Sequence, residues 1–210
     1  LKESLVKKFS FLHDVSDVLL FTNSGRRIIA YGDKSFPLNL KKDFLDTYLK
    51  QLVEKKGVPV WKGLNKDIEE RLVPFATSPE KMNKSDCILL GRAVLSLETR
   101  EIIGTLIIRT NERYFSNIYR NIDMGTGTDI FVIDSDGIVV SSRNPMLPVA
   151  KLYKNPNLIK ELLARKESDD RIFSISIDNN PHLVAFSYIQ SANWFVVSTI
   201  PYSYLNSEAK

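Results

Sequence analysis

The chain has 210 residues, of which 43% are hydrophobic and 26% charged, an ordinary globular composition that can build one large or two small cores. Its net charge of +4 is modest and its basic residues are scattered, so the composition does not indicate nucleic acid as a partner. The single cysteine excludes an intramolecular disulfide, and no apolar run approaches the roughly 20 residues of a membrane span.

The first residues carry apolar side chains at helical spacing, namely Leu1, Leu5, Phe9 and Leu12. This stripe predicts a helix over residues 1–13. Because the pattern is already under way at the first residue, we expect the helix to continue upstream and the chain to be a piece of a longer protein.

Two stretches share one pattern of apolar run, glycine turn and second apolar run. Residues 18–31 contain it around Gly25, and residues 130–142 repeat it around Gly137. Glycine supplies the positive φ that such turns need. The repetition predicts two similar modules in tandem.

The remaining elements fill out each module in the same order. In the first module, we expect a helix (41–56), a short strand (58–61), a hairpin (88–97 with 102–109) and a helix (111–122). In the second, we expect a helix (157–165) capped by Asn155-Pro156, strands (171–177, 181–189 and 193–200) and a helix from residue 202.

The predicted fold class is therefore α+β, with two antiparallel sheets and flanking helices. We divide the chain into an N-terminal helix (1–13), a first module (14–124), a second module (125–201) and an exit helix (202–210).

Motifs for catalysis, metals and cofactors are absent from the sequence. The two histidines, His13 and His182, have no partners at metal-ligand spacing, and the turn at 134–137 lacks the remaining ligands of a calcium loop. Gly125-Thr126-Gly127 follows a helix and lacks the third glycine of a dinucleotide fingerprint. We expect no metal, no cofactor and no enzymatic activity in this fragment.

The stretch Asp129–Ser142 resembles the Cache sensor domains of bacterial membrane receptors. The ending resembles them too, with Trp194 opening the last strand and Ile200-Pro201 leading into the final helix, as does Ile103–Ile108 at the end of the first module. The resemblance covers nearly the whole chain and is of the double-Cache type, with two tandem PAS-like modules.

The resemblance implies an extracytoplasmic ligand sensor, held at the extracellular side of the bacterial membrane by flanking spans and dimeric in the full receptor. Within that class of receptors, the sequence is most similar to sensor histidine kinases that partner AraC-type response regulators. The alternatives are a chemoreceptor or cyclase sensor, or a module without a small ligand that binds a partner protein as the source of its signal and dimerises through the apolar faces of residues 1–12 and 111–122.

Four residues are candidates for binding a small molecule. Trp61 would stack on a planar or sugar-like ligand, and Arg92 would clamp a carboxylate or phosphate; the alternatives are a core tryptophan and a solvent-facing arginine. Tyr31 and Asp86 flank the same strands. The residues around Trp61 do not match the family's amino-acid-binding signature, Tyr…Arg-x-Trp-Tyr…Asp, and we interpret Trp194 as a core residue.

Overall fold

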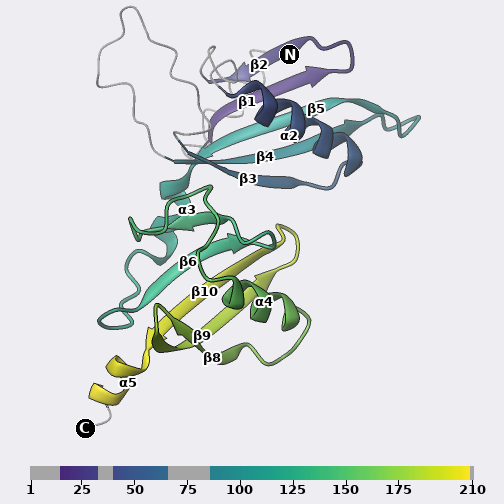
Figure 1. The fold of residues 1–210 in the computed structure, drawn as a ribbon. Coiled ribbons are helices and arrows are strands. Elements are labelled where there is room, and N and C mark those ends of the chain that lie inside the picture. Colours follow the sequence, from purple (N-terminus) through teal and green to yellow (C-terminus); the bar gives the residue numbers. More distant parts are fainter. Residues whose placement is uncertain (1–14, 33–39, 66–85, 209–210) are drawn as a thin grey trace, which may run out of the picture. The chain divides into compact units, whose positions relative to one another are not determined.

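The computed structural model describes residues 15–32, 40–65 and 86–208 (Figure 1). The chain divides into two compact units between Tyr114 and Phe115. The sequence interpretation placed the boundary later, at residue 125. The helix predicted over residues 1–13 and the last two residues of the predicted exit helix lie outside the described residues.

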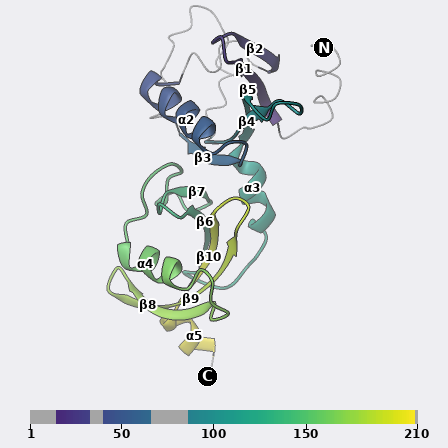
Figure 2. The same cartoon turned by 90° about the vertical axis from the view of Figure 1, so that its right-hand side faces the viewer.

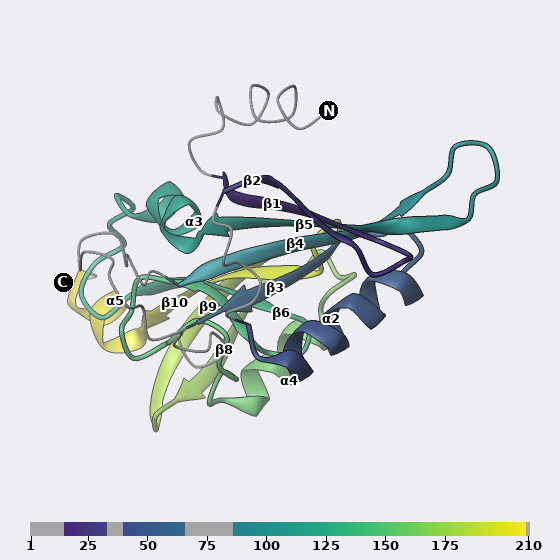
Figure 3. The ribbon, with the colours of Figure 1, turned by 90° about the horizontal axis from the view of Figure 1, so that it is seen from above.

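The first unit is built on a five-stranded antiparallel sheet with strand order β2-β1-β5-β4-β3. Its elements are β1 (Val15–Thr22), β2 (Arg27–Tyr31), α2 (Lys42–Glu54), β3 (Val60–Leu64), β4 (Cys87–Leu95) and β5 (Ile102–Asn111). Helix α3 (Glu112–Tyr119) follows β5 directly and belongs to the second unit from Phe115 onwards. Helix α2 lies across one face of this sheet (Figure 3).

The core of the first unit lies between α2 and the sheet. The helix places Tyr48 and Leu52 on the sheet, and both are almost fully buried. Gly91 allows this close approach, because a Cβ there would lie 2.5 Å from the Tyr48 hydroxyl oxygen and 2.7 Å from Leu52. Burial raises the pKa of Tyr48, whose hydroxyl donates to the Val60 carbonyl at 2.8 Å. The helix predicted over 41–56 is thus confirmed.

The second unit repeats this architecture. Its elements are β6 (Asp129–Asp134), β7 (Val139–Ser142), α4 (Pro156–Ala164), β8 (Ile172–Ile177), β9 (Asn180–Ile189), β10 (Trp194–Pro201) and α5 (Tyr202–Glu208). The strand order is β7-β6-β10-β9-β8. This is the strand order of the first sheet with five added to each strand number. The predicted tandem repeat and its antiparallel sheets are confirmed, in a structure that is mostly sheet.

Local chemistry explains the turns and caps that the sequence predicted. The Asp134 carboxylate accepts hydrogen bonds from the backbone N–H groups of Asp136 and Ile138, and the turn closes with Gly137 at φ +78°. Gly25 has a similar φ of +76° in the first hairpin. At the start of α4, the Asn155 side chain accepts from two backbone N–H groups of the first turn.

The second sheet is covered by α4 on one face and by α3 on the other (Figure 2). Leu158 and Leu162 of α4 are completely buried in a core of aromatic and aliphatic side chains. On the α3 side, the edge of the Phe115 ring meets the Trp194 ring at a centroid distance of 5.7 Å. Trp194 is 5% exposed, so its predicted role as a core residue is confirmed.

Candidate functional site

Two of the predicted binding residues lie together on the face of the first sheet opposite α2. Trp61 pairs with Leu90 in the β3–β4 register, and Arg92 follows Leu90 by two positions on β4. Side chains two positions apart on a strand share a face, so Trp61 and Arg92 are diagonal cross-strand neighbours, about 7–8 Å apart. An aromatic ring and a guanidinium are therefore presented side by side.

Arg92 is exposed, and it makes no hydrogen bond or ion pair with any residue that the structure describes. Trp61 is partly buried beside it. A guanidinium in this situation keeps its planar fork of donors available for a carboxylate or phosphate. The pair can bind an anion and cover its apolar part with the indole ring.

Tyr31 and Asp86 lie away from this pair. Tyr31 is on the opposite edge strand, and three strands separate β2 from β3, so it lies about 19 Å from Trp61 across the sheet. Asp86 precedes β4 and lies about 20 Å from Arg92 along the strand. Its backbone carbonyl accepts a hydrogen bond from the N–H of Glu112 at 2.9 Å. One small ligand cannot contact all four predicted residues.

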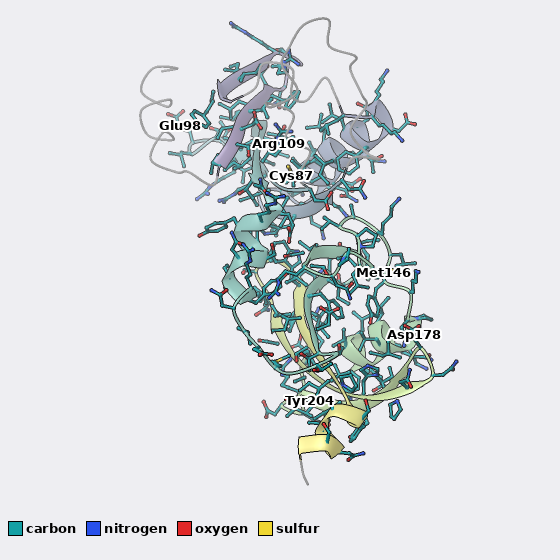
Figure 4. All side chains as sticks on the ribbon, turned by 90° about the vertical axis from the view of Figure 1, so that its left-hand side faces the viewer. Cys87, Glu98, Arg109, Met146, Asp178 and Tyr204 are labelled. Carbon is teal, nitrogen blue, oxygen red and sulfur yellow. The ribbon has the colours of Figure 1, made fainter. Side chains whose placement is uncertain are left out.

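A buried ion pair lies on the α2 face of the same sheet. The Nε atom of Arg109, a residue labelled in Figure 4, is 2.5 Å from Asp17 Oδ2. The side chain of Arg109 is 14% exposed and that of Asp17 is 1% exposed. Arg109 also pairs in register with Leu89 of the core. Sequence reasoning missed this pair, although a carboxylate just before the apolar run that starts at Val18 was a signal for it.

The second unit contains a cavity of about 460 Å³. It lies where α3 ends, β6 begins and the chain leaves β7. Its lining residues are Tyr119, Ile122, Asp123, Met124, Gly125, Gly127, Thr128, Asp129, Ile130, Arg143, Asn144 and Pro145. Sequence reasoning missed this site, because most of these residues belong to loops without a recognisable motif.

Polar groups from three segments, including the backbone carbonyls at the end of α3, converge on the cavity. The Asn144 amide donates to Asp129 Oδ2 at 2.6 Å. The Arg143 guanidinium donates to the carbonyls of Tyr119 and Arg120 at the end of α3. These carbonyls carry the negative end of the helix dipole, so the charge of Arg143 is used largely to cap α3.

A profile of the Cache domain family matches residues 1–209. This chain belongs to the Cache domain family. No curated protein matches it. Among solved structures, it is similar to the extracellular domain of a protein described as a histidine kinase, rpHK1S-Z16 (17% identity, TM-score 0.67, 95% of this chain and 76% of that chain).

Two chemoreceptor structures are also similar to this Cache domain. The ligand-binding domain of CtaA from Pseudomonas fluorescens, in complex with L-isoleucine, is 14% identical, with TM-score 0.55 over 89% of this chain and 69% of that chain. The sensory domain of Tlp3 from Campylobacter jejuni, with isoleucine bound, is 17% identical, with TM-score 0.54 over 98% and 73%. At these identities the likeness establishes the fold.

Across residues 15–32, 40–65 and 86–208, no helix combines the length and apolar character needed to cross a bilayer. Within the same ranges, no three side chains of the types that bind metals gather into a group that could hold an ion.

Asp129 lines the cavity and has a pKa that burial shifts from its usual value. Burial raises the pKa of its carboxyl group above the usual 3.8, even though Asn144, the Ile130 backbone and the charge of Arg143 act to lower it. Burial is also the main reason why the pKa of Tyr153 rises to about 12, and the charge of Asp129 adds to that rise. The Asp129 carboxylate is thus costly to keep ionised where it lies.

This cost predicts a pH dependence of stability. A carboxyl group whose pKa is raised on folding is neutral in both states below pH 3.8, and it destabilises the fold progressively as the pH rises through the raised pKa. We therefore expect Asp129→Asn to gain unfolding free energy relative to the wild type between pH 3 and pH 7. Urea titrations across this range measure the difference. The exposed Asp136→Asn is the control, and a difference for Asp129→Asn that does not change with pH would contradict the prediction.

Proposed function

We propose that this Cache domain is the extracytoplasmic ligand-sensing part of a bacterial sensor histidine kinase, one that partners an AraC-type response regulator. The family match over residues 1–209 and the likeness to an extracellular domain of a protein described as a histidine kinase support this assignment. The fragment itself is a binding domain, and any kinase activity belongs to the rest of the receptor.

The proposed ligand is a small molecule with a carboxylate or phosphate group, bound to the first unit by Arg92 and Trp61. The observation that carries this proposal is the exposed guanidinium of Arg92, without a partner among the described residues and diagonal to an aromatic ring. The amino acids in the CtaA and Tlp3 structures are carboxylates of this kind. Because the amino-acid signature is not met around Trp61, we place the ligand in the wider class of small anions.

A thermal-shift screen of the 210-residue chain against carboxylates and phosphate esters tests the proposal. A ligand at 100 times its Kd stabilises the folded state by about 2.7 kcal/mol, which gives a readily measured rise in Tm. We expect Arg92→Ala and Trp61→Ala each to abolish the rise, measured from the Tm of each variant without ligand. Arg26→Ala, another exposed arginine of the first unit, is the control. An anion that stabilises all the variants equally would remove Arg92 and Trp61 from the site.

A second candidate is a dimerisation module that receives its signal from a partner protein. The apolar side chains of Tyr114, Ile118 and Ile122, along and just after α3, are 47%, 71% and 53% exposed and follow helical spacing. Sedimentation at increasing concentration, with Ile118→Asp as the disrupting variant, distinguishes this candidate. A chain that stays monomeric at high concentration would exclude it.

A further inference from the structure

The cavity of the second unit differs from the proposed anion site in its charge. It is lined by the carboxylates of Asp123 and Asp129 and by the guanidinium of Arg143, which is already bonded to the end of α3. The Asp123 carboxylate accepts from the N–H of Gly125 at 2.9 Å. The net charge of these three side chains is therefore negative.

Asp129 is the group in this cavity best suited to bind a ligand. Its hydrogen-bond donors, the Asn144 side chain and the Ile130 backbone, are neutral, and it forms no ion pair with any described residue. Burial without an ion pair leaves the negative charge poorly stabilised, because burial outweighs the influence of Arg143, and a cation that entered the cavity would compensate the charge. The volume of about 460 Å³ lies in the range of small-molecule sites.

The wall of the cavity is also in direct contact with the end of the second unit. Gly125 packs against the ring of Tyr204 in α5 so closely that a Cβ at this position would overlap the ring, and its φ of +96° likewise favours glycine. A Cβ at Gly127 would lie 3.1 Å from Pro201, and the Ser198 hydroxyl donates to the Met124 sulfur at 3.5 Å. Tyr204 lies where α5 joins the sheet (Figure 4).

We propose that this cavity is a second ligand site, which binds a small molecule carrying a protonated amine against Asp129 and reports its occupancy to α5. The segment from Met124 to Gly127 forms one wall of the site and touches both the last strand and α5. A ligand that favours one arrangement of this wall shifts the position of α5 to the extent that its affinity differs between the two arrangements.

Binding is tested with simple amines on the 210-residue chain. The probes are ethanolamine, putrescine and agmatine, and acetate and lactate serve as anionic counterparts, with Tm measured against concentration at pH 7. We expect at least one amine to raise Tm saturably. Asp129→Asn should weaken its apparent affinity by about tenfold or more, whereas the exposed Asp136→Asn should leave it unchanged.

Two further variants separate this site from the one proposed for the first unit. Arg92→Ala and Trp61→Ala should retain the rise in Tm with the amine. The proposal for one site can therefore fail in these measurements while the proposal for the other site holds. No saturable rise with any amine, a response equal in Asp129→Asn and the wild type, or a stronger response to acetate than to the amines would overturn the proposal.

The link to α5 is tested by amide hydrogen exchange over residues 202–208 with and without the amine. We expect the amine to change exchange in the wild type and in Asp136→Asn. In Tyr204→Ala, we expect the amine still to raise Tm but no longer to alter exchange in α5. An unchanged exchange response in Tyr204→Ala, or none in the wild type when Tm rises, would refute the link.

Discussion

Replacing Arg109 by methionine should lower the unfolding free energy of the first unit by about 3–5 kcal/mol. Asp17 is 1% exposed and its carboxylate is 2.5 Å from Arg109 Nε, so the substitution removes the guanidinium that faces this buried charge. Burial makes the Asp17 carboxylate costly to keep ionised once this guanidinium is removed, and that cost outweighs the lost attraction itself. Chemical denaturation monitored by circular dichroism measures the change.

The double variant Asp17→Asn/Arg109→Met separates the two contributions. With both charges removed, it should recover a substantial part of the loss, since no carboxylate remains buried at position 17. Arg26→Met, at an exposed position of the first hairpin, is the control and should change stability by no more than about 0.5 kcal/mol. A double variant as unstable as Arg109→Met alone would show that the damage comes from packing rather than charge.

Truncating Phe195 to alanine should cost the second unit about 3–5 kcal/mol. Its side chain is 1% exposed on the central strand β10, with ring centroids 4.9 Å from Tyr188 and 6.0 Å from Phe186. The cavity left behind cannot collapse easily, because strands on both sides of β10 hold the backbone in place.

The matched comparison is Ile172→Ala on the edge strand β8, where the side chain is 56% exposed. We expect a cost below about 1 kcal/mol there, because little apolar surface is removed from the interior. Equilibrium unfolding in guanidinium chloride compares the two variants. Similar losses in both would mean that β10 is not the centre of the second core.

The elements that the sequence predicted well are those specified by neighbouring residues. The turns at Gly25 and Gly137, and the cap formed by Asn155, depend on contacts within a few positions, so their chemistry is visible in the sequence. The tandem repeat was visible for the same reason, because both modules use the same glycine-turned hairpin. Strand alternation predicted that Arg92 lies on the face opposite Leu89 and Ala93, and in β4 these two residues are buried while Arg92 is exposed.

The features that the sequence did not reveal depend on the order of strands in the sheet. Tyr31 and Trp61 were grouped as candidates, but β2 and β3 form opposite edges of the first sheet. The Asp17–Arg109 pair joins residues 92 positions apart and exists only through the β1–β5 register. The cavity around Asp129 is assembled from three loops and strand ends, and no local pattern marks such a convergence.

In both units the chain leaves through the middle of the sheet. The central strand β5 continues directly into α3, and the central strand β10 continues directly into α5, with no intervening loop. Because each of these strands is hydrogen-bonded to a neighbour on both edges, the helix that follows it starts from backbone that the sheet holds on both sides.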